Sequence, residues 1–372
     1  MPQKLRLGIL GAARIAPSAV ISPIANNSDL AVEIRAVAAR DGERARAFAT
    51  EHGIPVVYDS YDALLADATV DAVYNPLPNS LHCEWTVRAL RAGKHVLCEK
   101  PLCNNADEAI RMQREAEDAG RVLIEAFHTV YHPASEAARG LLHAGSVGEL
   151  QSITVSTLAN YMRDPAAGVL ASYPPTSADD DVRLNSALGG GCMMDIGCYD
   201  IMAVRFLTGM ELRCTAATAD VFVGDPLVDD AIEADFSFPH TGATARIRNT
   251  WASDDKPDWA LPEGAASIVI QGSGGRMEIH GFPPSKIQLN GQEVALPSVT
   301  DTQTTMYWQL RAFAAEVKMQ EAKGVDCGKP WAYTMKSCPR DAVAQMAVLD
   351  DVYEKAGLGK RLTTHPAPAP KL

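Results

Sequence analysis

The sequence has few positive charges, and it lacks the cysteine patterns that build metal sites. It contains 34 Lys and Arg against 46 Asp and Glu, which gives a formal net charge of −12. This balance argues against non-specific binding to nucleic acids or to anionic membrane surfaces. The eight cysteines form no C-x-x-C pair and the nine histidines are dispersed. We therefore predict no metal site, and reduced cysteines in a cytoplasmic protein.

Long apolar runs are also absent. No run reaches the length of a membrane span, and the first residues lead into a strand without the hydrophobic region of a signal peptide. We therefore expect no membrane attachment. What the chain does have is 372 residues with 47% hydrophobic content. That is enough for a large core, and the length favours two domains over one.

The first part of the chain begins with a strand, a tight turn and a helix. Residues 4–10 predict the strand, and residues 15–25 predict the helix. Small residues at 11, 13 and 16 match the spacing of the dinucleotide fingerprint G-x-G-x-x-G, with alanine at the second and third positions. Such a match also occurs in ordinary βα turns. Its place at the start of a βαβ pattern favours a nucleotide site.

The end of the second predicted strand, residues 32–39, bears on the choice of cofactor. The fingerprint expects an acidic residue here that binds the ribose 2′-hydroxyl. Arg40 stands near that place, followed by Asp41. Because a guanidinium can bind a 2′-phosphate through charge-assisted hydrogen bonds, we predict NADP, with NAD as the alternative. The competing interpretation is that Arg40 is a solvent-exposed strand end.

Helices and strands continue to alternate as far as residue 126. We predict helices at 42–52, 61–66 and 106–119, a helix ending at Arg91, and strands at 55–58, 71–75, 94–99 and 121–126. This alternation predicts about six parallel strands in a Rossmann domain that spans residues 1–126. Asn79 or Ser80 is expected to cap the helix that ends at Arg91. His82, in its first turn, is a candidate for lining the site.

The pattern changes at residue 127, where the second domain (127–372) is expected to begin. A helix at 133–143 precedes long alternating strands at 149–158, 213–223, 231–238 and 243–251, and a hairpin at 265–280. These strands predict an α+β domain with a large open, mostly antiparallel sheet. Helices at 305–323 and 339–356 follow, and the C-terminal one can pack back on the first domain. One sheet face has no predicted helix over it. We expect that face to be apolar and to form a homodimer or a dimer of dimers.

Two groups of polar residues are candidates for chemistry. Lys100 directly follows a predicted strand, at the edge of a parallel sheet where ligands gather, although a lone Glu–Lys pair is usually a surface feature. Asp195 and Tyr199 lie four residues apart, which predicts that they share one face of an apolar helix opened by three glycines. Polar groups among apolar neighbours are costly unless they have partners or a task.

Four segments, in this order, resemble the Gfo/Idh/MocA family of NAD(P)-dependent oxidoreductases over residues 4–360: 8–11 (GILG), 99–101 (EKP), 125–128 (EAFH) and 195–199 (DIGCY). Residues 75–82 and Tyr199 further resemble the branch of dimeric dihydrodiol and D-xylose dehydrogenases. The resemblance implies that Lys100 contacts nicotinamide and substrate, and that the peptide bond before Pro101 is often cis. It also implies that Tyr199 replaces a catalytic histidine and that Asp195 binds or orients substrate. The residues expected to bind the dinucleotide are Gly11, Ala13, Arg14, Ile15, Arg40, Pro76, Asn79, His82, Glu99 and Lys100.

Oxidation of an alcohol requires a hydride acceptor and a base. A tyrosine, with an ordinary pKa of about 10, needs a nearby cation to act as that base, and Lys100 can supply it. Burial and the nicotinamide charge would also lower the lysine pKa, so either residue can carry the proton. We expect Tyr199 to be the acid/base, Lys100 its electrostatic partner and Asp195 the substrate orienter.

The predicted function is an NADP-dependent oxidoreductase that acts on CH–OH groups. It transfers a hydride between nicotinamide and a secondary alcohol or carbonyl of a sugar, inositol or related polyol. The exact substrate and the direction of the reaction stay open. The alternatives are an oxidoreductase that holds and recycles its nicotinamide internally, and a non-catalytic regulatory protein that senses NADP.

Overall fold

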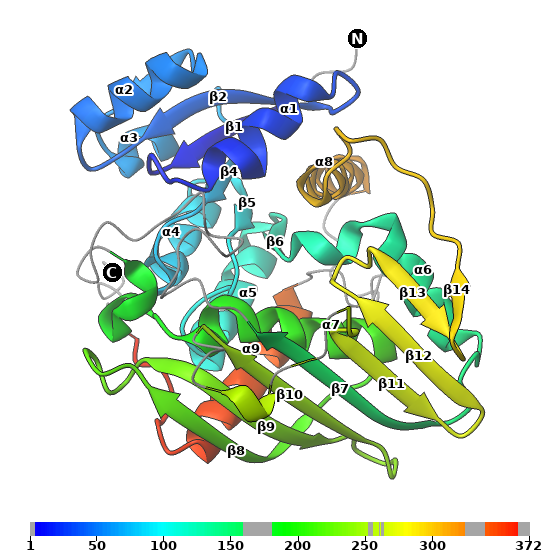
Figure 1. Ribbon diagram of the computed structural model, residues 1–372. Coiled ribbons are helices and arrows are strands. Elements are labelled where there is room, and N and C mark those ends of the chain that lie inside the picture. Colours follow the sequence, from blue (N-terminus) through cyan, green and yellow to red (C-terminus); the bar gives the residue numbers. More distant parts are fainter. Residues whose placement is uncertain are drawn as a thin grey trace. The chain divides into compact units, whose positions relative to one another are not determined.

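The computed structural model describes residues 4–158, 181–251, 256–259, 261, 264–323 and 339–363. The chain divides into two compact units, whose elements are labelled in Figure 1. The first unit comprises Met1–Tyr131, Val299–Val343 and Thr363–Leu372, and the second comprises His132–Ser298 and Ala344–Leu362. None of the helices in the described part of the chain combines the length and apolarity that a membrane span needs.

A six-stranded parallel sheet forms the core of the first unit. Its strands, in spatial order, are β3 (Val56–Tyr58), β2 (Val32–Ala38), β1 (Leu5–Leu10), β4 (Ala72–Asn75), β5 (His95–Cys98) and β6 (Leu123–Glu125). This is the Rossmann order, in which the strand sequence reverses between β1 and β4. The helices of this unit are α1 (Ser22–Asn26), α2 (Gly42–His52), α3 (Tyr61–Ala66), α4 (Asn79–Arg91), α5 (Ala106–Ala119) and α8 (Thr305–Lys323). The predicted Rossmann fold is confirmed.

Helix ends follow local sequence in one case and depart from it in another. The Asp41 carboxylate accepts two backbone N–H groups in the first turn of α2, and the helix ends at Gly53 with φ of 65°. Both are standard end signals. The predicted cap of α4 is wrong: the capping position is Pro78, with no side-chain cap bond, and Asn79 and Ser80 lie inside the helix. The preceding prolines fix the backbone entry instead.

The helix predicted at 15–25 is also irregular. It consists of a π-helical segment, Pro17–Ile21, followed by the short helix α1. The backbone N–H of Ser22 bonds to the carbonyl of Pro17, five residues back. Pro23 has no N–H and so cannot continue an α-helical bond ladder. This is a physical reason why one continuous α-helix does not form.

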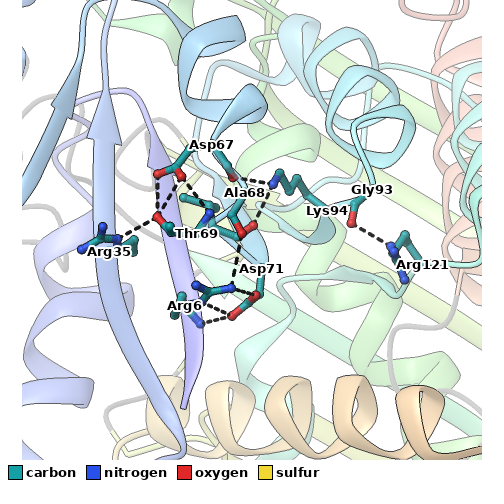
Figure 2. A network of polar contacts seen from close by, with 10 residues as sticks. Arg6, Arg35, Asp67, Ala68, Thr69, Asp71, Gly93, Lys94 and Arg121 are labelled. Atoms are coloured by element: carbon teal, nitrogen blue, oxygen red, sulfur yellow. Dashed lines mark hydrogen bonds and ion pairs between the residues drawn. The ribbon is translucent and has the colours of Figure 1, made fainter. Parts of the chain in front are cut away.

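A polar network joins the starts of three strands in the first unit, as Figure 2 shows. The Arg6 guanidinium forms two hydrogen bonds with the Asp71 carboxylate, at 2.9 and 2.6 Å. The Lys94 ammonium donates to the backbone carbonyls of Asp67 and Val70, at 2.7 and 2.8 Å. The network lies at the amino ends of β1, β4 and β5, so it fixes the sheet edge opposite to the one where ligands bind in such folds. Its other members are Arg35, Thr69, Gly93 and Arg121.

The second unit contains an eight-stranded sheet. Its strands, in spatial order, are β14 (Gln292–Val294), β13 (Lys286–Leu289), β12 (Gly275–His280), β11 (Ile268–Gly272), β7 (Leu150–Leu158), β10 (Thr244–Thr250), β9 (Asp229–Ser237) and β8 (Arg213–Val221). Strands β7 and β10 pair in parallel, and the other pairings among the described strands are antiparallel. Helices α6 (Pro133–His143) and α7 (Cys198–Thr208) belong to this unit, and α7 contacts β7 and β10. The mostly antiparallel sheet is confirmed, whereas β13 and β14 were not predicted.

One side of β9 and β10 differs from the expected apolar surface. Ala245 and Ile247 are buried, and the residues that alternate with them, Arg246 and Arg248, are charged and lie on the opposite side of the sheet. There, Arg246 pairs with Asp235 at 2.6 Å, and Arg248 pairs with Glu233. The prediction that this face is apolar is therefore wrong at these strands. The homodimer stays a prediction, but an apolar sheet face no longer supports it.

Candidate functional site

The turn after β1 has the conformation that a dinucleotide-binding turn requires. Gly11 has φ of 91°, and its N–H donates to the carbonyl of Ala38 on β2 at 2.6 Å. A Cβ atom at Gly11 would lie 3.1 Å from the Leu77 side chain, in a backbone region that L-residues rarely adopt. Ala13 and Ile15 are half-buried and Arg14 is exposed. A strand, a glycine turn and a helix at the point where strand order reverses fit a nicotinamide dinucleotide.

Two arginines lie beside this turn. Arg40 is exposed at the end of β2, and it lies close enough to Tyr61 for its charge to act on the pKa of that hydroxyl. Arg44, in the first turn of α2, donates to the carbonyl of Ala12 at 2.9 Å. Burial raises the pKa of Tyr61, and the positive charges of both arginines oppose that rise. Sequence reasoning identified Arg40 but missed Arg44, although the spacing of four residues and the capping Asp41 were signals for it.

Lys100 lies directly after β5, at the carboxyl edge of the parallel sheet. The peptide bond between Lys100 and Pro101 is cis, as the resemblance implied. The Glu99 N–H donates to the carbonyl of Asn75 at the end of β4, at 3.0 Å. The Glu99 carboxylate accepts a hydrogen bond of 2.6 Å from the hydroxyl of the buried Tyr74. Backbone and side chain of Glu99 thus fix the residue that precedes Lys100.

His82 connects the loops that follow β4 and β5. Its ring is fully buried, with Nδ1 at 2.9 Å from the carbonyl of Pro101 and Nε2 at 2.7 Å from the carbonyl of Leu77. Burial lowers its pKa to about 4, and the Lys100 charge acts in the same direction. His82 is therefore neutral at pH 7. A neutral imidazole has a single N–H, so it donates to one of the two carbonyls and packs against the other. Its contact with a dinucleotide stays a prediction, as does that of Pro76.

His128 is a further residue near Lys100. Its Nδ1 lies 2.7 Å from the Thr305 hydroxyl. Burial, together with a smaller effect of the Lys100 charge, lowers its pKa to about 4. Sequence reasoning used His128 only as part of a motif and assigned it no role. His128 and Lys100 are 28 positions apart along the chain. A local sequence pattern therefore does not reveal that the charge of Lys100 acts on His128.

The second unit contains Asp195 and Tyr199. Asp195 lies in a π-helical segment, Met193–Gly197, and Tyr199 lies in α7. The expectation of one regular α-helix through both residues is therefore wrong, because the segment of Asp195 is π-helical. That the two side chains share one helical face stays a prediction. Asp195 Oδ2 accepts a hydrogen bond from Arg183 Nε at 3.0 Å. Sequence reasoning did not identify this arginine.

A buried ion pair supports the start of that segment. Arg361 Nη2 lies 2.9 Å from Asp229 Oδ1, and Tyr353 donates to the same oxygen at 2.8 Å. The other oxygen of Asp229 accepts the backbone N–H of Met193 at 2.6 Å. Gly191 has φ of 134°, and a Cβ atom there would lie 2.2 Å from Asp229 Oδ1. The last of the three glycines is thus required by the close approach of the ion pair.

Asp200 is a buried acid next to Tyr199 in sequence. Thr157 on β7 donates to it at 2.7 Å, and the Asn249 amide on β10 lies 3.4 Å from its other oxygen. Burial raises its pKa to about 7, against the effect of these two hydrogen bonds. Asp200 connects α7 to two neighbouring strands. It therefore links the position of the Tyr199 helix to the sheet.

The structure groups the predicted residues by unit. The first unit holds Lys100 and all the residues predicted to bind the dinucleotide, and the second holds Asp195 and Tyr199. A Rossmann sheet with a glycine turn, an arginine pair and a lysine at its carboxyl edge defines a class, the nicotinamide-dependent oxidoreductases.

Family models match both parts of the chain. One, described as an oxidoreductase family with an NAD-binding Rossmann fold, matches residues 5–127, and one described as the GFO/IDH/MocA C-terminal domain matches residues 135–281. The chain belongs to the Gfo/Idh/MocA family, as its motifs predicted. It is an NAD(P)-dependent dehydrogenase or reductase that acts on CH–OH groups.

Individual relatives refine the comparison. D-xylose 1-dehydrogenase (NADP(+)) 2 from Haloferax volcanii is 34% identical over 361 residues, covering 95% of this chain and 98% of the relative. Trans-1,2-dihydrobenzene-1,2-diol dehydrogenase from Xenopus tropicalis is 28% identical, covering 70% and 72%. A 3-ketoreductase from Actinomadura kijaniata, solved with NADP and TDP-benzene, is 26% identical with a TM-score of 0.74, covering 94% of this chain and 97% of that one. The predicted branch of the family is confirmed.

Proposed function

We propose that this protein is an NADP-dependent oxidoreductase that interconverts a secondary alcohol and a carbonyl of a sugar, inositol or related polyol. The observation that carries the choice of NADP is the pair of guanidinium groups, Arg40 and Arg44, beside the Gly11 turn. Two neighbouring guanidinium groups suit the dianionic 2′-phosphate that distinguishes NADP from NAD.

The proposal of a sugar or polyol substrate is supported by the xylose dehydrogenase relative, which aligns with nearly the whole length of both chains. That relative is a dehydrogenase of an aldose, D-xylose, with NADP as its cofactor. The dihydrodiol dehydrogenase relative supports a substrate with vicinal hydroxyl groups. We therefore place aldoses first and inositols and diols after them in the choice of test substrates.

When bound, the dinucleotide supplies the site that accepts or donates a hydride. In our proposal the turn of Gly11, Ala13, Arg14 and Ile15 holds the pyrophosphate, Arg40 and Arg44 hold the 2′-phosphate, and Pro76, Asn79, His82 and Glu99 line or support the nicotinamide end. Lys100 polarises the substrate oxygen with its positive charge, and the Tyr199 hydroxyl transfers the proton to or from that oxygen. Asp195 accepts a hydrogen bond from a substrate hydroxyl and so orients the substrate. Either Lys100 or Tyr199 can be the final proton carrier.

The central test measures turnover after removal of each proton-handling group. Lys100→Ala and Tyr199→Phe should each lower kcat about 10²–10⁴-fold, because an acid/base group contributes that much. Their double variant should be little worse than the poorer single one, since groups that act on one step are not additive. The measurement is NADP reduction with aldoses, inositols and diols, with NADP affinity determined in parallel by fluorescence.

The control for this test is Lys318→Ala, which removes an exposed lysine of α8 and should leave kcat unchanged. Wild-type turnover in Tyr199→Phe would exclude tyrosine as the proton carrier. Tight NADP binding without turnover on any substrate would favour the regulatory alternative. Nicotinamide that stays bound through purification would favour internal recycling.

A second test concerns the cofactor. Arg40→Asp should lower kcat/KM for NADP by about ten- to a hundredfold relative to NAD, because one charge-assisted contact is lost. The matched control is Arg46→Asp, which changes an exposed arginine of the neighbouring helix α2 that pairs with Asp59. An NADP/NAD ratio equal to that of the wild type would show that Arg40 is only an exposed strand end.

A further inference from the structure

Arg183 is tied to the segment that carries Asp195 by both its backbone and its side chain. Its carbonyl accepts the N–H of Gly191 at 2.9 Å, and the Gly191 carbonyl accepts the N–H of Asp195 at 3.0 Å. The Arg183 side chain then bonds to the Asp195 carboxylate at 3.0 Å. Three hydrogen bonds thus close a ring through Arg183, Gly191 and Asp195.

The glycines allow this ring to form. A Cβ atom at Gly190 would lie 2.3 Å from the Arg183 carbonyl oxygen and 2.9 Å from that of Asn185. Any other residue would push the backbone of Arg183 away from the turn. The sequence predicted only that the three glycines open a helix. They also allow the segment of Arg183 to approach the start of that helix closely.

The Arg183 guanidinium is also held from its other side. Its Nη1 lies 3.3 Å from Asp181 Oδ1, and the same oxygen accepts the Arg183 backbone N–H at 3.0 Å. The side chain of Asp181 is 6% exposed, that of Asp195 is 17% exposed and that of Arg183 is 27% exposed. An arginine fixed between two largely buried carboxylates has little freedom to turn away. It can therefore hold the Asp195 carboxylate in one orientation and in its ionised form.

We propose that Arg183 is a positioning residue for Asp195, which it holds ionised and oriented for a substrate hydroxyl. This inference rests on the proposed function, in which Asp195 accepts that hydroxyl. Arg183 acts through Asp195 and contributes to selection of a substrate with a hydroxyl at that position. We expect NADP affinity to be unchanged in Arg183 variants, because the residues proposed to hold the cofactor belong to the first unit.

The experiment compares Arg183→Gln, Arg183→Lys and Asp195→Asn with the wild type on the best substrate found. Arg183→Gln should lower kcat/KM about ten- to a hundredfold through loss of one charge-assisted bond, with unchanged NADP affinity. Arg183→Lys keeps the positive charge but not the planar guanidinium group. Its kcat/KM should therefore lie between that of the wild type and that of Arg183→Gln. The acid limb of the kcat/KM profile should move to higher pH in Arg183→Gln, because the carboxylate loses the cation that favours its ionised form. Arg276→Gln is the matched control, since Arg276 is an exposed arginine paired with Glu278 in the same unit.

Deoxy analogues of the substrate give a second readout. The wild type should discriminate against the analogue that lacks the hydroxyl bound by Asp195, and Arg183→Gln should lose most of that discrimination. The double variant Arg183→Gln/Asp195→Asn should be no worse than Asp195→Asn alone, because both act through one carboxylate.

The outcomes separate this inference from the proposed function. If Asp195→Asn is impaired while Arg183→Gln behaves as the wild type, the inference is wrong and the proposed function stands. If Asp195→Asn itself turns over normally, the role of Asp195 in the proposed function is wrong. If Arg183→Gln loses activity with an unchanged pH profile, and additively with Asp195→Asn, Arg183 is only structural and the inference is overturned.

Discussion

Two arginine–aspartate pairs, one in each unit, lie in different surroundings. Arg6 binds Asp71 through two bonds at the amino edge of the parallel sheet, where the two side chains are 27% and 26% exposed. Arg361 binds Asp229 under the Gly191 turn, where they are 5% and 0% exposed. Because water screens the first pair and not the second, the same chemistry should contribute differently to stability.

The pairs also differ in what they fix. The Arg6 network holds strand starts, at the sheet edge away from Lys100 (Figure 2). At the carboxyl edge, the contacts are made by His82, by the backbone of Asn75 and by the Glu99 carboxylate. In the second unit, charged groups act at the predicted site, since Asp229 accepts the N–H of Met193 two residues before Asp195. The Arg6–Asp71 pair thus lies away from the predicted site of its unit, whereas the Arg361–Asp229 pair adjoins the predicted site of the second unit.

The largest expected effect comes from breaking the buried pair. Arg361→Met should reduce the free energy of unfolding by about 3–5 kcal/mol, because it leaves Asp229 as an uncompensated buried charge. The measurement is the urea midpoint, with far-UV circular dichroism as the probe. Asp229→Asn in the Arg361→Met background should restore part of the loss, since it removes the orphaned charge. A loss below 1 kcal/mol would contradict the buried-charge argument.

The next effect concerns the pH dependence that Asp200 imposes. Burial raises its pKa to about 7 from an ordinary 3.8. Between these values the folded protein holds a proton that the unfolded chain releases. Its contribution to stability is therefore full below about pH 4 and is lost as pH rises through about 7. At 1.36 kcal/mol per pKa unit, the wild type should lose about 3 kcal/mol from this group between pH 5 and pH 8.

Asp200→Asn should remove that fall, so its stability should change less than the wild type's over the same range. Urea unfolding of both proteins at pH 5 and pH 8 gives the comparison, and Asp351→Asn on the exposed side of α9 (Pro339–Lys355) is the control. Parallel curves for wild type and Asp200→Asn would show that Asp200 does not titrate in this range. His82 should have the opposite pH dependence, because its pKa is about 4 in the folded protein and about 6.5 in the unfolded chain. As pH falls below 6.5, the unfolded chain takes up a proton that the folded protein does not, and the free energy of unfolding decreases.

The sequence was sufficient where structure is determined locally. Strand β5 is a continuous buried run, α2 has its cap at Asp41 and its stop at Gly53, and the Gly11 turn follows β1 directly. These signals lie within a few residues of the element they specify, so the Rossmann sheet and the place of Lys100 could be predicted.

The ion pairs around the predicted site of the second unit could not be predicted in this way. Arg361 meets Asp229 across 132 positions of sequence, and Arg183 meets Asp195 across 12. Neither separation leaves a periodic pattern, because both pairs depend on tertiary packing. The two shortest strands at the sheet edge, β13 and β14, were missed because segments of three or four residues carry little alternation.

The smallest effect should come from the partly exposed pair, Arg6 and Asp71. Arg6→Gln should reduce the free energy of unfolding by about 1 kcal/mol or less, because both partners are partly solvated. The backbone N–H of residue 6 keeps its bond to the Asp71 carboxylate, at 2.9 Å, so the variant does not orphan a charge. The urea midpoint in low salt and in 1 M NaCl is the measurement. Added salt should shrink the difference between Arg6→Gln and wild type, since the Debye length falls to about 3 Å at 1 M, and it should leave the loss in Arg361→Met nearly unchanged. Equal losses in the two variants, with equal salt dependence, would mean that burial does not distinguish the two pairs.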